Sequence, residues 1–173
     1  MSTAEKLNHI EPSPTSSEFV QVSPVELDDL RGQKAAIHRS QAVIEFLPDG
    51  TILTANSNFL SALGYNLDEI SGRHHRMFCD SAFTGSLQYK MLWEKLARGE
   101  FESGEYKRLA KGGREIWIQA SYNPVFDTAG KVVKVVKFAS DITAQKLKSL
   151  DYEGQISAIS KSQAVIEFNL DGI

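Results

Sequence analysis

The sequence contains a single cysteine, Cys79, among its 173 residues. One thiol excludes an internal disulfide framework and fits a reducing compartment. No apolar run approaches the roughly 20 residues of a membrane-spanning helix, and the N-terminus lacks the apolar core of a signal peptide. These absences predict a cytoplasmic protein without a membrane span.

Strong charge of either sign is also missing, since 19 basic and 22 acidic residues give a formal net charge of -3. No basic stripe stands out, and the most basic segment, Lys107–Arg114, is better explained as the tip of a hairpin. We therefore expect no nucleic acid partner. Catalytic motifs are equally scarce: there is no Ser-His-Asp constellation, no motif that pairs carboxylates, and no Gly-Lys-Ser/Thr after Lys111-Gly112-Gly113. The sequence predicts a binding protein, not an enzyme.

What the chain does contain is an internal repeat. Ser40–Gly50, SQAVIEFLPDG, returns as Ser162–Gly172, SQAVIEFNLDG. Aligning Asp29–Gly50 with Asp151–Gly172 gives identity at 14 of 22 positions. This spacing suits one small domain and is too long for a solenoid unit. We expect the first copy to head a complete domain at 40–143, and residues 162–173 to be the first strand of a second, truncated domain.

Two helical segments are expected to flank the complete domain. Residues 1–22 are rich in Ser, Thr, Pro and Glu and predict a flexible leader. The capping box at Ser23–Glu26, with Pro24 at the first helical position, starts a helix predicted over 23–39. A charged helical segment at 144–161 is the predicted linker helix.

The N-terminal helix also carries a candidate dimer surface. Leu27, Leu30, Lys34 and Ile37 follow three- and four-residue steps, typical of a short coiled-coil seam or of packing on the chain's own domain. The strand at Val132–Phe138 is apolar on both faces between its lysines, so its outer face needs cover. We expect this helix, from the same or a partner chain, to cover the outer sheet face, and we expect a homodimer.

Between these helices the pattern predicts an α+β fold. Alternating residues and Gly-containing turns predict five strands, at 42–47, 51–55, 103–110, 115–126 and 131–142. Helical spacing predicts short helices after Asn56, at 66–70 and around 89–98, and the stretch from Phe78 to Gly85 is expected to be irregular. One antiparallel five-stranded sheet with the helices on one face would bury Ile44, Phe46, Ile52, Trp93, Ile116 and Ile118.

That order, with its residues, resembles a PAS (Per-Arnt-Sim) sensor domain. The resemblance rests on Asp49–Ile52, Ala55–Phe59, Leu63–Tyr65, Glu69–Gly72, Trp93–Gly99, Lys111–Trp117 and Asp141–Thr143. His74–Asp80 and Gln119–Phe126 are similar to the tandem PAS domains of soluble bacterial methyl-accepting chemotaxis receptors. The resemblance implies a cytoplasmic signal-transduction sensor that passes its state through the linker helix to a downstream signalling module.

In PAS folds a cofactor lies between the sheet and the central helices. The resemblance therefore implies these candidate cofactor-binding residues: His74, His75, Met77, Phe78, Trp93, Gln119 and Asn123. His74 or His75 could ligate haem iron, and Trp93 could stack on the ring of FAD. The plainer alternatives are a core tryptophan, hydrogen-bonding histidines and a cofactor-free dimerisation module with a structural role.

His74, His75 and Cys79 are too few and too close in sequence for a zinc site, so no other metal is expected. Cys79 could sense redox state, although only nearby Arg76 favours a reactive thiol.

Three residues are candidates for the signal relay. Asn58 begins a helix beside the Asp-Gly turn, where its side chain could bond backbone groups. Asp141 and Thr143 lie where the last strand leaves the sheet. Asp141 could cap the outgoing helix, or it could pair with a basic residue and couple strain in the core to the position of that helix.

Overall fold

The computed structural model describes residues 22–162 of the chain. The predicted leader at 1–22 and the predicted repeat strand at 162–173 lie outside the described residues, apart from Val22 and Ser162. None of the described helices is both long and apolar enough to cross a membrane.

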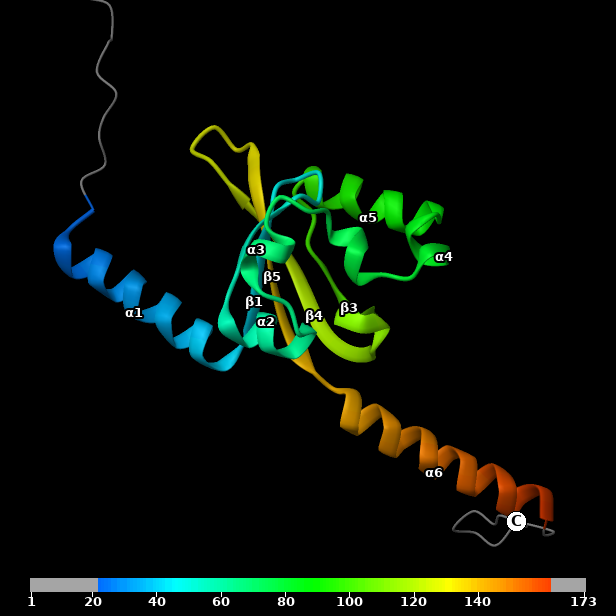
Figure 1. Ribbon diagram of the computed structural model, residues 1–173. Coiled ribbons are helices and arrows are strands. Elements are labelled where there is room, and N and C mark those ends of the chain that lie inside the picture. Colours follow the sequence, from blue (N-terminus) through cyan, green and yellow to red (C-terminus); the bar gives the residue numbers. More distant parts are fainter. Residues whose placement is uncertain (1–21, 163–173) are drawn as a thin grey trace, which may run out of the picture. The chain divides into compact units, whose positions relative to one another are not determined.

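One five-stranded antiparallel sheet forms the centre of the fold (Figure 1). Its strands are β1 Ala42–Phe46, β2 Ile52–Ala55, β3 Glu102–Leu109, β4 Glu115–Phe126 and β5 Val132–Asp141. They lie in the order β2-β1-β5-β4-β3, so the first strand pairs with the last. The predicted fold class is confirmed: strands from both ends of the domain meet in one antiparallel sheet.

Short helices fill the long connection between β2 and β3 and lie on one face of the sheet (Figure 1). They are α2 Ser57–Leu63, α3 Leu67–Ile70, the 3-10 turn η1 His75–Phe78, α4 Ser81–Thr84 and α5 Leu87–Ala97; a second 3-10 turn, η2 Lys111–Gly113, joins β3 to β4. Gly64 ends α2 at a φ of 74°, in the left-handed region that glycine adopts without strain.

The expectation of an irregular chain from Phe78 to Gly85 is wrong in part. Residues Ser81–Thr84 form α4, because the Asp80 carboxylate accepts the Phe83 N–H at 2.7 Å and caps the turn. A four-residue helix is too short to show apolar periodicity, so only its cap could have indicated it.

The core lies between the sheet and these helices. Ile44, Phe46, Ile52, Trp93, Ile116 and Ile118 are all buried, with at most 8% of any side chain exposed, which confirms the predicted core. The Phe46 and Trp93 rings pack edge to face with their centres 5.5 Å apart.

Two longer helices precede and follow the sheet: α1 Pro24–Ser40 and α6 Thr143–Ser162. No residue of α1 is buried, and the predicted seam residues Leu27, Leu30 and Ile37 are 40%, 53% and 40% exposed. Cover of this seam by a partner chain therefore stays a prediction.

Candidate functional site

Three strands send polar side chains into the apolar core. Arg108 of β3, Tyr122 of β4 and Lys137 of β5 are 4%, 0% and 2% exposed, and His75 of η1 is 0% exposed. Tyr122 and Lys137 are directly paired across β4 and β5, so the pleat turns both side chains to the same face. Together with Tyr89 of α5, which is also buried, they form what we call the polar cluster. Buried polar groups are costly unless they have partners.

A hydrogen-bond chain runs through the polar cluster. Tyr122 Oη lies 3.0 Å from His75 Nε2, and Tyr89 Oη lies 3.1 Å from His75 Nδ1. The guanidinium of Arg108 donates to Tyr122 Oη at 3.3 Å. Because arginine can only donate, we assign the Tyr122 proton to His75 Nε2 and the His75 Nδ1 proton to Tyr89. This assignment requires a neutral imidazole, and burial, aided by the charges of Lys137 and Arg108, lowers the His75 pKa well below its ordinary value.

The cluster contains two cations but no carboxylate. Lys137 Nζ lies 4.7 Å from the ring centre of Tyr122, and the Arg108 guanidinium carbon lies 4.7 Å from that of Tyr106 and 5.5 Å from that of Phe83. None of the ion pairs among the described residues includes Arg108 or Lys137. Burial, and then the charge of Arg108, lower the Lys137 pKa well below its ordinary value. The site is short of negative charge.

The candidate haem ligands are already engaged. His74 Nδ1 accepts the Arg76 N–H at 3.2 Å, so the proton lies on Nε2, which donates to the Asp49 carbonyl at 2.8 Å. Both nitrogens of His75 lie within hydrogen-bond distance of tyrosine hydroxyls. Haem iron needs the lone pair of a ring nitrogen. In this arrangement neither His74 nor His75 has a ring nitrogen with a free lone pair, so the residues present do not fit haem.

Trp93 is a core residue in this structure. The rings of Phe46, His74 and His75 surround its indole at centre-to-centre distances of 5.5, 6.0 and 5.4 Å. Gly50 approaches so closely that a Cβ there would lie 2.8 Å from the indole. A flavin ring could stack on Trp93 only after these neighbours move. The described packing therefore does not fit a flavin at Trp93.

The predicted binding face of β4 is wrong. Ile118, Ala120 and Tyr122 point into the core, and successive side chains of a strand alternate between its faces. Gln119 is therefore exposed, and Asn123 lies on the opposite face, where its amide donates to the Val136 carbonyl at 3.2 Å.

The other predicted candidates lie beside the polar cluster. Phe78 is buried against Phe59 and Tyr65, and Met77 is half-buried at the edge of the core. Cys79 Sγ lies 3.8 Å from His75 Nδ1, but burial raises the pKa of this thiol, which does not favour a reactive thiolate.

Sequence reasoning missed four members of the polar cluster: Tyr89, Arg108, Tyr122 and Lys137. One signal was available for Lys137. It follows Val135 and precedes Ala139 at two-residue steps, and both of those residues are buried. A lysine in phase with the apolar face of a strand indicates a buried charge.

The candidate relay residues hold elements together. Asn56, not Asn58, caps α2, because its side-chain oxygen accepts the Phe59 N–H at 3.0 Å. Asn58 does bond backbone groups, as expected, but these are the carbonyls of His38 and Gln41, each at 3.1 Å, and not groups of the Asp-Gly turn.

The start of α6 is hydrogen-bonded to β4 at Trp117. The Thr143 hydroxyl oxygen accepts the Trp117 N–H at 2.9 Å, and the Ile142 N–H donates to the Trp117 carbonyl at 2.9 Å. The Asp141 carboxylate accepts the Thr143 N–H at 2.8 Å, so it stabilises the start of the helix. No basic partner for Asp141 occurs among the described side chains, and the first of its two predicted roles fits better.

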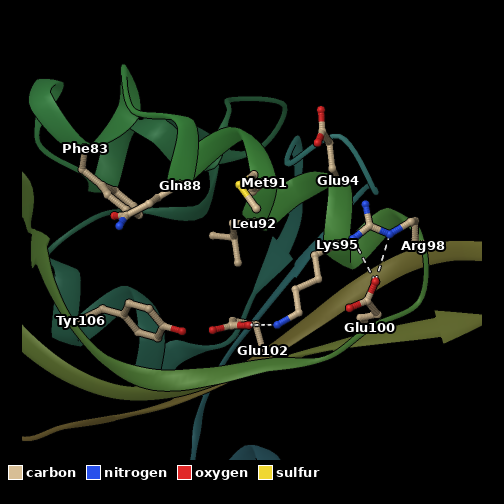
Figure 2. Close-up of a pocket in the computed structure, with 10 residues that line it drawn as sticks. All are labelled: Phe83, Gln88, Met91, Leu92, Glu94, Lys95, Arg98, Glu100, Glu102 and Tyr106. Carbon is tan, nitrogen blue, oxygen red and sulfur yellow. Dashed lines mark hydrogen bonds and ion pairs between the residues drawn. The ribbon is translucent and has the colours of Figure 1, made fainter.

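A groove of about 570 Å³ opens between α5 and β3 (Figure 2). Leu92 and Tyr106 face each other across it, and the Lys95–Glu102 ion pair, at 2.5 Å, bridges its two sides. Phe83 and Tyr106 line one end of the groove, and both rings contact Arg108 of the polar cluster. Only the rings of Phe83 and Tyr106 therefore separate the groove from the buried guanidinium of Arg108.

Comparison with known proteins identifies this architecture. A family model described as "PAS fold" matches residues 52–139. The biofilm dispersion protein BdlA of Pseudomonas aeruginosa is 50% identical over 138 residues, which are 80% of this chain and 33% of BdlA. The oxygen sensor protein DosP of Escherichia coli is 30% identical over 128 residues, 72% of this chain and 15% of DosP.

Solved structures show the same fold at lower identity. An RNA-binding light-oxygen-voltage receptor superposes with a TM-score of 0.63 at 22% identity, covering 84% of this chain and 41% of the receptor. A PAS domain of a Colwellia psychrerythraea protein gives 0.59 at 19% identity, covering 68% and 99% of the two chains. The chain spans 33% and 15% of the curated relatives BdlA and DosP. With its sheet order, helical face and matching family model, the chain belongs to the PAS family, a family of sensing modules in signal transduction.

Proposed function

We propose that this PAS domain is a ligand-binding sensor module of a cytoplasmic, chemotaxis-like signalling protein, and that it is not an enzyme. A small molecule in the core would change the polar cluster, and α6 would carry that change to a downstream signalling module. The similarity to BdlA, over a third of that protein's length, supports membership of a longer signalling protein.

A single observation carries this proposal: one strand connects the core to the outgoing helix. Tyr122 and Trp117 both belong to β4, with Tyr122 in the polar cluster and Trp117 bonded to Ile142 and Thr143. A rearrangement at Tyr122 that shifts or twists β4 therefore reaches the first turn of α6. Lys146 adds a second link, because it pairs with Glu105 of β3 and lies over the Trp117 ring at 5.5 Å.

The test starts by finding what the protein binds. The purified chain is denatured, and the released small molecules are identified by absorption spectra and mass spectrometry. Hydrogen exchange is then compared with and without the identified molecule. Sensing requires a change in the exchange of the amides of Trp117, Ile142 and Lys146. Binding that leaves all three amides unchanged contradicts the relay.

The alternative function, a cofactor-free dimerisation module, is favoured by the side-chain packing around Trp93 and the exposed seam of α1. If no molecule co-purifies, and neither haem nor FAD binds when added, this alternative is preferred.

A further inference from the structure

The polar cluster holds two buried basic groups, Arg108 and Lys137, and no acidic side chain among the described residues pairs with either one. Their contacts are aromatic rings, the Tyr122 hydroxyl and, for Arg108, the Lys107 backbone carbonyl at 2.8 Å. These groups stabilise a cation much less than a carboxylate does in a dry interior. Arg108 Nε and Tyr106 Oη are buried without any hydrogen-bond partner, although most buried polar atoms have one. A buried basic group without an acidic partner, beside hydrogen-bond donors without acceptors, suits an anionic ligand.

The groove gives that anion a way in. Phe83 and Tyr106 line the groove, and the centres of their rings lie 5.5 and 4.7 Å from the Arg108 guanidinium carbon. Phe83 belongs to α4, a four-residue helix held by the cap at Asp80. Rotation of the Phe83 or Tyr106 side chain would join the groove to the guanidinium without changing the sheet.

The walls of the groove select the class of anion. Phe83, Met91 and Leu92 are apolar and suit a ligand with an apolar body. Glu94, Glu100 and Glu102 also line the groove, but each is paired with a basic side chain: Lys90, Arg98 and Lys95 in that order. The apolar walls therefore make the selection, because they do not suit a compact, strongly hydrated phosphate. A planar carboxylate matches the paired N–H groups of a guanidinium.

We propose that the groove between α5 and β3 and the polar cluster behind it form one site for a small organic carboxylate, whose acid group binds Arg108 and Lys137. The apolar body of the ligand lies against Leu92 and Phe83. This inference rests on the proposed sensing function and names its ligand class.

If Arg108 and Lys137 bind a carboxylate, they lower the stability of the protein when no ligand is present. Lys137→Met removes a buried amine that has no carboxylate partner and replaces it by an apolar side chain of similar length. It should raise the thermal midpoint of the ligand-free chain and at the same time weaken carboxylate binding. A lysine with a purely structural role would not give these opposite effects.

The experiment uses the whole 173-residue chain and measures thermal midpoints and calorimetric affinities. The probes are phenylacetate, benzoate and isovalerate, each beside its primary amide, and inorganic phosphate. We expect at least one carboxylate to bind, while its amide and phosphate do not. Arg108→Gln should weaken that binding at least tenfold, and Lys137→Met several-fold. Lys107→Gln is the matched control, because Lys107 is the neighbouring cation of β3 and pairs with Glu115 outside the core; it should bind as the wild type does.

Three results would overturn the carboxylate site: equal binding of a carboxylate and its amide, unchanged affinity in both Arg108→Gln and Lys137→Met, or no binding of any carboxylate.

Hydrogen exchange at Ile142 and Lys146 separates this proposal from the sensing function. If a neutral co-purified molecule changes that exchange, the sensing function is supported and the carboxylate site is contradicted. If a carboxylate binds through Arg108 but leaves the exchange unchanged, the site is supported and the relay from the core to α6 is contradicted.

Discussion

Two tyrosines on adjacent strands show how much a single hydroxyl contributes in this core. The rings of Tyr106 and Tyr122 pack edge to face, 5.8 Å apart, but only the Tyr122 hydroxyl has partners, His75 and Arg108. Tyr122→Phe leaves a buried imidazole nitrogen and a guanidinium N–H unpaired, so we expect it to lower the free energy of unfolding by about 1–3 kcal/mol. Tyr106→Phe removes a hydroxyl without a partner and should be neutral or slightly stabilising. Urea denaturation of both variants checks this, and equal losses would show that the Tyr122 bonds contribute nothing.

The buried imidazole of His75 makes stability depend on pH. Its folded pKa lies well below the value of about 6.5 in an unfolded chain, because of burial and then the nearby cations Lys137 and Arg108. Below pH 6.5 the unfolded chain binds a proton that the folded chain does not, so stability is lost as the pH falls. We expect up to about 1.4 kcal/mol of lost unfolding free energy per pH unit from this residue.

Urea denaturation between pH 7.5 and 5.5 measures that slope. His75→Gln should be less stable than the wild type at pH 7.5, because it disturbs the hydrogen bonds to Tyr89 and Tyr122. The slope of its unfolding free energy against pH should nevertheless be smaller, by the contribution of one proton. His38→Gln, outside the polar cluster, is the control for loss of an imidazole. An unchanged slope in His75→Gln would assign the pH dependence to other groups.

At the scale of elements, the junction between β5 and α6 depends on one hydroxyl. The Thr143 oxygen is the acceptor for the Trp117 N–H, and Thr143→Val removes it while keeping the shape of the side chain. The half-buried amide then has no partner, so we expect a loss of about 1–2 kcal/mol and faster hydrogen exchange at Trp117 and Ile142.

Ser140→Ala is the matched control for this junction. It removes an exposed hydroxyl that bonds Gln41 near the end of the same strand, and its effect on unfolding should stay within about 0.5 kcal/mol. Slow exchange at Trp117 in Thr143→Val would mean that α6 is held in place without this bond.

At the scale of the whole molecule, the exposed seam of α1 predicts a dimer interface. Its seam residues Leu27 and Leu30 are about half exposed in the single chain, an arrangement that suits a partner chain. A Leu27→Ser/Leu30→Ser double variant should therefore shift the protein from dimer to monomer in light scattering. Val25, which is 80% exposed and lies off the seam, gives the control Val25→Ser. A double variant with wild-type mass would exclude the seam as the dimer interface.

The sequence alone determined the strands, the helices other than the short α4, and most of the core. Alternation with a period of two, together with Gly-containing turns, is a local property of the chain, and it was sufficient to predict all five strands and the burial of Ile44, Phe46 and Ile116. The family resemblance came from local motifs of the same kind and is confirmed by the family model.

Only the tertiary structure decided the polar cluster. Tyr122 and Lys137 come together because β4 pairs with β5 in one particular register, and Arg108 joins them from β3 across the second pair. The site prediction failed at Gln119 for the same reason. An alternating strand always has two faces, and the more polar face looked like a binding surface, although packing of the helices turned it outward. Which face is buried, and which charges meet there, is fixed by contacts between residues far apart in the chain, and a local pattern does not contain that information.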